Sequence, residues 1–250
     1  MTDSAGVPFA GRAFHANQSA QDDGSAPPAV MAAIAGFRSG GLGIADVVVA
    51  LHGERLLVPL VAVRGDDGVG AHGQLVDKTQ ELSIVTVAGP DGRAVLPAFT
   101  SADAMRAWDP LARPIPIEAS RIALASAQEG TQLIIIDPAS PTEIGIRRPA
   151  FRALATGDVW VPALEDPGVL EAFRAPTAGE PKVQGLRLVA GDPDARLVAP
   201  EVVVLLTVVE GLERNELDAL IARVGAAWAG DPTILDRVDS LTVRIDSVPG

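Results

Sequence analysis

The sequence predicts an α+β fold in which a larger N-terminal domain, with a mixed sheet and helices, precedes a small ββαβ C-terminal domain. Short apolar runs of strand length alternate with segments of helical periodicity, and turns rich in glycine and proline separate them. The clearest helical pattern is Leu217, Leu220, Ile221, Val224 and Trp228, which follow the i, i+3, i+4, i+7 spacing. With 250 residues, the chain has room for one large domain or two small ones.

The elements of the N-terminal domain follow from local signals. Pro59 interrupts the apolar run 56–63, which we therefore place as a strand at a sheet edge or a bulge. The Asp91-Gly92 pair predicts a hairpin, and Thr100, three residues before Asp103, indicates a helix start that resembles a capping box. We expect helices at 29–38, at 45–51, shortly after Thr100, at 117–129 and after Pro149, and strands at 56–63, 82–87, 94–98, 132–136 and 143–146.

The C-terminal domain has a simpler pattern. Strands at 186–190 and 201–209 flank the turn Gly191-Asp192-Pro193-Asp194, and a helix at 217–228 and an alternating strand at 241–245 follow. Before this domain, Asp166-Pro167 begins one helix within otherwise connecting structure. The first residues are small and polar, with little apolar surface to offset the entropy of ordering. The expected organisation is a disordered tail at 1–28, the N-terminal domain at 29–157, a connecting segment at 158–184 and the C-terminal domain at 185–250.

Composition excludes several classes of function. The chain has no cysteine, which rules out disulfides, thiolate metal sites and cysteine nucleophiles. Its net charge is −12, and residues 156–250 alone hold 16 acidic and 8 basic residues, which disfavours nucleic-acid binding because that binding neutralises phosphates. No secretory leader is recognisable, and charged residues interrupt the most apolar stretch, 44–63. We therefore expect a cytoplasmic protein that binds neither nucleic acid nor membrane.

No motif indicates a cofactor, a metal or a catalytic residue. Residues Gly68-Val69-Gly70-Ala71-His72-Gly73 have the glycine spacing of a dinucleotide site, but no helix is expected after them, as that site requires. The three histidines, His15, His52 and His72, lack metal-ligand spacing, and Asp192-Pro193-Asp194 indicates a turn rather than a calcium loop. No G-x-S-x-G nucleophile motif is present, and the carboxylates of 210–218 are typical of a solvated helix face.

One cluster of positive charge has an unusual position. Arg147, Arg148 and Arg152 lie at the start of the helix that Pro149 opens, where cations oppose the helix dipole. Free amides together with guanidinium groups can hold an anion, so these arginines are a possible site for an anionic ligand or an acidic segment of a partner. The alternative is that Glu143 and other surface acids pair with them.

Several motifs resemble the SseB family, the enhanced serine sensitivity proteins of actinobacterial type. Similarity to the family's N-terminal domain lies in Leu57-Val58-Pro59-Leu60-Val61, in Asp77-Lys78-Thr79-Gln80-Glu81-Leu82, and in Leu96-Pro97-Ala98-Phe99-Thr100-Ser101 with Trp108. Residues from Pro200-Glu201-Val202-Val203-Val204 through Gly211-Leu212 to Arg237-Val238-Asp239-Ser240-Leu241 resemble its C-terminal domain. The resemblance covers residues 54–157 and 185–246. It implies the two-domain architecture but no cofactor or catalytic residue.

These observations favour a non-enzymatic binding or regulatory module. It would bind a protein partner, a second copy of itself in a homo-oligomer, or a small ligand. Two alternatives remain: an enzyme whose site is assembled from dispersed Asp, Glu and Arg residues, and a structural protein that acts through self-association. A closed pocket with convergent titratable groups would favour the enzyme. A flat apolar patch with a polar rim would favour the binding module, and a self-complementary two-fold interface would favour the structural protein.

Overall fold

Two small sheets form the framework of the N-terminal unit. The computed structural model describes residues 22–62, 82–84, 86–128 and 130–248. One sheet has the order β2 (Leu82–Ile84), β1 (Arg55–Ala62), β5 (Arg113–Glu118), and the other has the order β3 (Val87–Ala88), β4 (Ala94–Ala98), β6 (Ile134–Ile136), β7 (Ile144–Ile146). A bridge between Leu57 and Phe99 joins them. Because β4 pairs with β6 in parallel and the other neighbours are antiparallel, the predicted mixed arrangement is confirmed.

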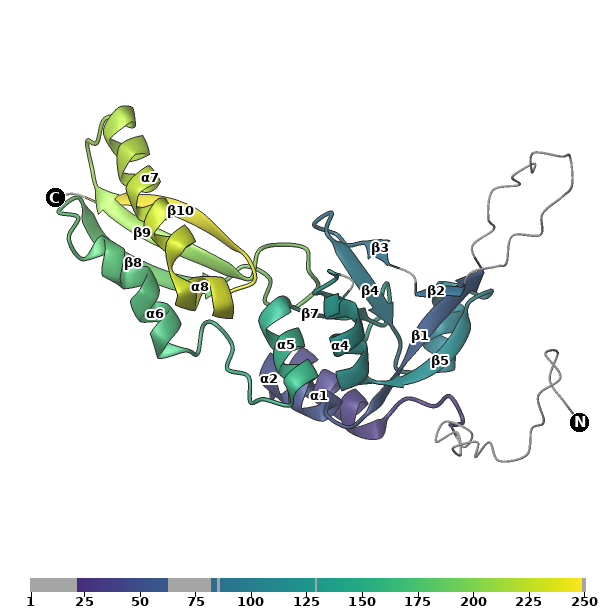
Figure 1. Cartoon of the computed structure of the whole chain (residues 1–250). Helices are drawn as coiled ribbons and strands as arrows, with labels where there is room; N and C mark the ends of the chain where they lie inside the picture. The colour runs from purple at the N-terminus through teal and green to yellow at the C-terminus, as the bar shows by residue number, and fades with distance from the viewer. Residues whose placement is uncertain (1–21, 63–81, 85, 129, 249–250) are drawn as a thin grey trace, which may run out of the picture.

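Helices pack against these sheets and complete the first core (Figure 1). They are α1 (Pro28–Arg38), α2 (Ile44–Leu51), α4 (Ala119–Gln128) and α5 (Arg148–Thr156), while the short α3 (Ala102–Trp108) packs beside β1. All three residues of β6 and of β7 are buried, which explains their uninterrupted apolar character in place of alternation.

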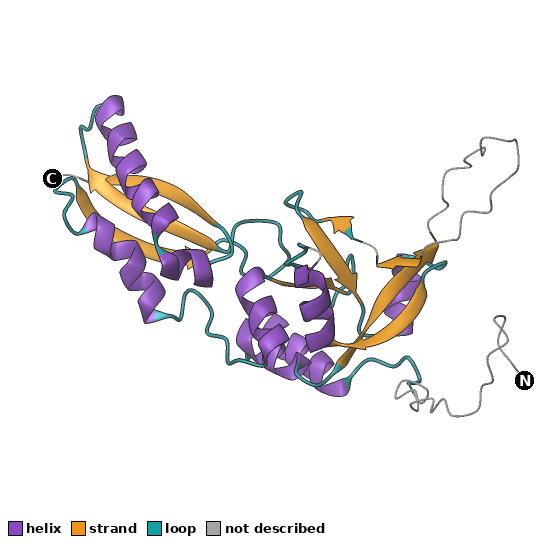
Figure 2. Ribbon diagram, in the orientation of Figure 1, coloured by secondary structure: helices purple, strands orange, loops and turns teal. Residues whose placement is uncertain are grey.

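The C-terminal unit has the predicted ββαβ order. Strands β8 (Val183–Ala190) and β9 (Val202–Val209) are antiparallel, and α7 (Arg214–Gly230) and α8 (Pro232–Arg237) lead to β10 (Leu241–Val248), which is parallel to β9. The helices cover one face of this sheet (Figure 2). Trp228 of α7 donates from Nε1 to the Phe173 carbonyl at 2.9 Å. Phe173 belongs to α6 (Pro167–Arg174), so part of the predicted connecting segment 158–184 packs into the C-terminal core, and a 3-10 turn at Ala175–Thr177 follows it.

Several local predictions were wrong. Residues 113–118 form strand β5, so the helix expected at 117–129 begins only at Ala119. Strand β1 lies in the middle of its sheet rather than at an edge, and Pro59 falls between the Leu57–Phe99 bridge and the residues that pair with β2. Ser101, not Thr100, caps α3, accepting a hydrogen bond from the Ala104 amide at 3.1 Å.

The first described residues lie against the N-terminal unit. Asp22 accepts from the Nη2 of Arg55 at 2.8 Å, and the Ala102 amide donates to the Gly24 carbonyl at 2.9 Å. Residues 22–27 are thus held in place although they belong to the predicted tail, while the rest of that tail, 1–21, lies outside the described residues. The glycine motif at 68–73, His15 and His72 also lie outside them.

Candidate functional site

The three arginines of the predicted anion site all bind the C-terminal unit of the same chain. Arg147, the residue before α5, donates to Asp192 at 2.6 Å and to Asp239 at 3.1 Å. Arg148 donates to the carbonyls of residues 235 and 238 at 2.7 and 2.6 Å, and Arg152 donates to Asp236 at 3.0 Å. The alternative expected Glu143 and other acids of the chain to pair with these arginines; other acids do so, whereas Glu143 pairs with Arg196 at 3.3 Å. An external anion would therefore have to displace acids and carbonyls of the chain itself.

Four residues form a largely buried ion-pair cluster at this junction: Arg93, Arg147, Asp192 and Asp239. We call them the junction cluster. The side chain of Arg147 is 8% exposed, and those of Asp192 and Asp239 are 1% exposed. Arg93 donates two hydrogen bonds to the carboxylate of Asp239, at 3.0 and 2.8 Å, in the bidentate geometry that is typical of arginine and carboxylate.

The pKa of Asp239 reflects opposing influences. Burial on its own pushes the pKa of this carboxyl upward, but the hydrogen bonds and positive charge of Arg93, with help from Ser240 and Arg147, outweigh burial. The pKa of Asp239 therefore lies below its ordinary value, and the carboxylate is charged where it meets the two arginines.

The loop between β8 and β9 carries Asp192 into the N-terminal unit. Its residues Ala195 and Leu197 have positive φ angles of 49° and 58°, and the carboxylate of Asp192 stabilises the turn by accepting from the Leu197 amide at 2.7 Å. Leu197 is fully buried among apolar residues of the N-terminal sheet, and the Gly145 amide of β7 donates to the Ala195 carbonyl at 2.6 Å. Figure 1 shows this loop reaching from the C-terminal sheet toward β7.

Gly145 makes this docking possible. A Cβ atom at position 145 would lie 2.4 Å from Cγ of Leu197, which is too close for any real side chain. A glycine inside a strand is a known sign that another part of the chain approaches closely. That glycine was the one signal in the sequence for this contact, although it could not identify Leu197 as the neighbour.

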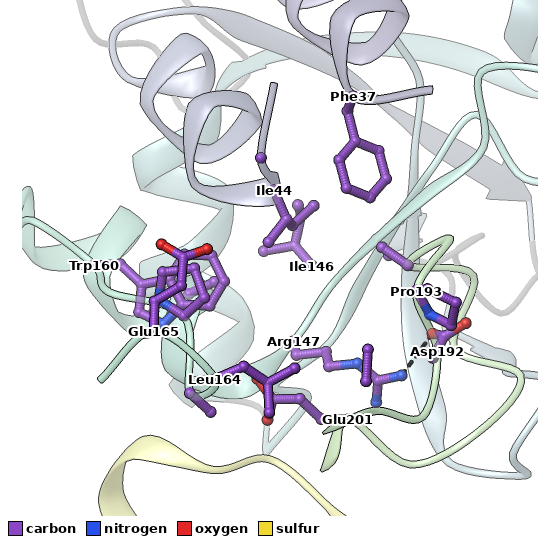
Figure 3. Close-up of a pocket in the computed structure, with 17 residues that line it drawn as sticks. Phe37, Ile44, Ile146, Arg147, Trp160, Leu164, Glu165, Asp192, Pro193 and Glu201 are labelled. Carbon is purple, nitrogen blue, oxygen red and sulfur yellow. Dashed lines mark hydrogen bonds and ion pairs between the residues drawn. The ribbon is translucent and has the colours of Figure 1, made fainter. Parts of the chain in front are cut away.

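A cavity of about 250 Å³ lies between the two units (Figure 3). Phe37 and Ile44 form one apolar wall, and Trp160 and Glu165 lie on another side. The polar side chains in its lining are Arg147, Trp160, Glu165, Asp192 and Glu201. Both units therefore contribute to a mostly apolar space with a few polar groups, the usual composition of a small-molecule site.

Glu201 is the most perturbed titratable group of the cavity. Its Oε2 accepts from the Asp239 amide at 2.6 Å, whereas no described residue donates a hydrogen bond to its Oε1. Burial, reinforced by the nearby charge of Asp239, raises the pKa of Glu201 to about 7, although the Asp239 amide and the charges of Arg147 and Arg148 oppose the shift. Sequence reasoning treated this residue only as the start of an apolar strand.

The lining limits the chemistry of the cavity. It holds no Ser, Thr, His, Lys or Tyr side chain among the residues that the structure describes. In the same part of the chain, no group of three or more His, Asp or Glu residues is placed to hold a metal ion, and no helix is long and apolar enough to cross a membrane. His52 follows α2, outside this cavity. What remains available to a ligand is apolar surface, carboxyl groups and the Nε1–H of Trp160, a buried donor with no partner among the described residues.

Comparison with known proteins finds a similarity for one part of the chain. Residues 29–152 match the family model described as the SseB protein N-terminal domain, and this range runs from α1 into α5. Neither the curated proteins nor the solved structures contain a match to the chain. The residues of the C-terminal unit lie outside the matched range. Over residues 29–152, the N-terminal unit of this protein is therefore similar to the SseB protein N-terminal domain.

Proposed function

We propose that this protein is a non-enzymatic binding module of the SseB family whose small ligand occupies the cavity between its two units. The observation that carries the proposal is the cavity itself, which has apolar walls from both units and a small number of convergent polar groups. A volume of about 250 Å³ is below the range of drug-sized pockets and suits a small molecule.

The position of the cavity supports a regulatory form of binding. Ile44 and Ile146 come from the N-terminal unit, whereas Asp192 and Glu201 come from the C-terminal unit. A ligand that touches both walls binds the closed arrangement of the units better than an open one, and so shifts the population toward it. Ligand binding would thereby change how the two units present their outer surfaces to a protein partner or a second copy of the chain.

An enzyme is the second candidate, and Glu201 is the observation that favours it. A carboxyl group with a pKa near 7 matches the requirement for a general acid or base at neutral pH. The surrounding Arg147 and Asp192 are the kind of dispersed residues from which such a site would be assembled. We favour binding because those two residues are engaged with each other and the described lining of the cavity supplies no hydroxyl, thiol, amine or imidazole nucleophile.

A fragment titration followed by ¹⁵N–¹H NMR on the full chain tests the proposal. We expect fragments to shift the amides of Gly145, Ile146 and Glu201, and we expect Ala190→Leu, which narrows the cavity at an exposed lining residue, to weaken binding. Ala226→Leu, at an exposed position of α7 outside the lining, is the matched control. Shifts confined to other surfaces, or equal binding by both variants, would contradict the proposal. Conversion of a bound fragment into product would favour the enzyme.

A further inference from the structure

We infer that the cavity between the two units selects a small amphipathic cation, an ammonium group carried on a short apolar body. This inference rests on the proposed function and adds the chemical class of the ligand. It follows from which polar groups of the lining are already occupied and which remain open.

Arg147 carries the positive charge of the described lining, and both terminal nitrogens of its guanidinium are engaged. Besides Asp192 and Asp239, the guanidinium of Arg147 donates to the Ala199 carbonyl at 2.7 Å and to Oγ of Ser240 at 3.3 Å. It therefore has little capacity left to hold an external anion. No other Lys or Arg side chain lines the cavity within the described ranges.

Asp192 is engaged as well. Its Oδ1 accepts from the Arg196 amide at 3.2 Å, and its Oδ2 accepts from Arg147 and from the Leu197 amide. These bonds hold the loop between β8 and β9 in its turn, so this carboxylate is a structural group of the cavity wall.

The carboxyl groups that remain open are Glu201 and Glu165. Oε1 of Glu201 receives no hydrogen bond from any described residue, and Glu165, which is exposed, forms no ion pair within the same part of the chain. Both carboxyl groups line the cavity, together with Leu164 and Trp160 (Figure 3). An anionic ligand would meet two carboxyl groups and no free cation, whereas an ammonium group would form a charge-assisted hydrogen bond with Glu201.

The rest of the lining suits an apolar body attached to that ammonium group. Phe37, Ile44 and Ile146 form apolar walls, and the aromatic face of Trp160 can attract a cation. Burying apolar surface of the ligand against these side chains would add the hydrophobic part of the affinity. Strongly hydrated inorganic cations gain nothing from such walls, which favours an organic amine.

Ionisation of Glu201 gives the inference a pH signature. The charged groups that influence this carboxyl are Asp239, Arg147 and Arg148, with Asp192 also in the cavity wall. A cation binds the ionised carboxylate, whose population grows about tenfold between pH 6 and pH 8 for a pKa near 7. Affinity for an amine should therefore increase with pH over this range, and affinity for an anion should decrease.

Three probes that share one apolar body test the inference on the full chain. They are 3-methylbutylamine, 3-methylbutan-1-ol and 3-methylbutanoate, titrated by NMR at pH 6 and pH 8. We expect the amine to bind at least tenfold more tightly than the alcohol at pH 8 and about tenfold more weakly at pH 6 than at pH 8. Glu201→Gln should abolish both differences, because the amide keeps an acceptor for the Asp239 amide but carries no charge. Glu210→Gln is the matched control, because Glu210 is exposed and lies at the opposite end of β9. This variant should keep both the preference for the amine over the alcohol and the pH dependence of amine binding.

The outcomes separate this inference from the proposed function. If the alcohol or the carboxylate binds in the cavity as tightly as the amine, the cavity is a ligand site but the inferred class is wrong. If none of the three probes shifts the cavity amides, both are contradicted. The pH dependence of the unmodified protein decides the question even if Glu201→Gln fails to fold.

Discussion

Single buried polar residues show how the fold depends on contacts that are distant in sequence. Asp137 is 1% exposed and has a positive φ of 47°. Its carboxylate accepts from the Thr100 amide at 2.8 Å, from the Thr100 hydroxyl at 2.7 Å and from the Thr142 hydroxyl at 2.8 Å. It thereby ties the end of β4 to the turn between β6 and β7.

Replacing Asp137 should be costly for this reason. We expect Asp137→Ala to lower the free energy of unfolding by about 2–3 kcal/mol, because buried donors lose a charged acceptor. Urea unfolding measures the change. Asp103→Ala is the control, since that side chain is 91% exposed and its pairing with Arg106 should contribute little. Equal effects of the two variants would contradict the role assigned to Asp137.

Glu201 should make stability depend on pH in the direction opposite to most carboxylates. Its pKa in the folded chain, about 7, lies above the ordinary value of 4.5, so the folded state binds more protons than the unfolded state between these values. The contribution of Glu201 to the free energy of unfolding is therefore fully present below pH 4.5 and is lost as pH rises through 7. Asp239, whose pKa is lowered, contributes stability above pH 3.8 that is lost as pH falls.

A comparison of Glu201→Gln with the unmodified protein isolates this effect. From pH 5 to pH 8, we expect the variant to gain roughly 2–3 kcal/mol of unfolding free energy relative to the unmodified protein, because glutamine has no charge to bury. Chemical unfolding at several pH values measures the difference. A difference that stays constant with pH would show that Glu201 titrates normally.

At the scale of elements, the close approach of backbone segments decides the effect of a glycine substitution on stability more than local propensity does. A Cβ atom at Gly191 would lie 2.1 Å from the Pro200 carbonyl oxygen, where the two ends of the β8–β9 loop meet. Gly225 lies within α7, and a Cβ atom there would meet nothing within 4 Å. The same substitution should therefore have opposite effects at the two positions.

Thermal and urea unfolding of the two alanine variants check this expectation. Gly191→Ala should lower the free energy of unfolding by about 1–3 kcal/mol, because the new methyl group would clash with the Pro200 carbonyl. Gly225→Ala should stabilise by about 0.5–1 kcal/mol, because alanine loses less backbone entropy in a helix. If Gly191→Ala were neutral, the loop would not be packed as described.

Most elements could be predicted from the sequence because their signals are local. Helix periodicity in α7, Asp166-Pro167 at the start of α6 and the Asp-Gly turn between β3 and β4 all act within a few residues. Strand β5 was missed because Pro114 and Pro116 disfavour a strand, yet β5 lies at a sheet edge, where prolines are tolerated. Helix α8 was missed because it has only six residues and begins directly after α7.

At the scale of the whole molecule, the site could not be predicted because it joins distant segments. The sequence indicated that Arg147 was unusual, since a cation at a helix start opposes the dipole. It could not show that Asp192 and Asp239, 45 and 92 positions later, would surround this arginine. Glu201 carried no local signal because its properties arise from burial between the two units.

The central claim is that the junction cluster holds the two units together and so maintains the cavity. Gly145 reports on this junction directly, because its amide is bonded to the Ala195 carbonyl of the β8–β9 loop. The Leu96 amide, bonded to the Leu133 carbonyl at 2.9 Å, reports on opening of the N-terminal unit alone. Amide hydrogen exchange at these two positions therefore separates opening of the junction from unfolding of a unit.

The decisive measurement is hydrogen exchange at Gly145 in the full chain, compared between the unmodified protein and Asp239→Asn. Removing one charge from the buried cluster leaves Arg93 and Arg147 short of a partner, so exchange at Gly145 should accelerate at least tenfold while Leu96 is unaffected. Asp236→Asn, which removes an exposed partner of Arg152, should change neither amide. Unchanged exchange at Gly145 in Asp239→Asn would contradict the claim that the junction cluster holds the two units together.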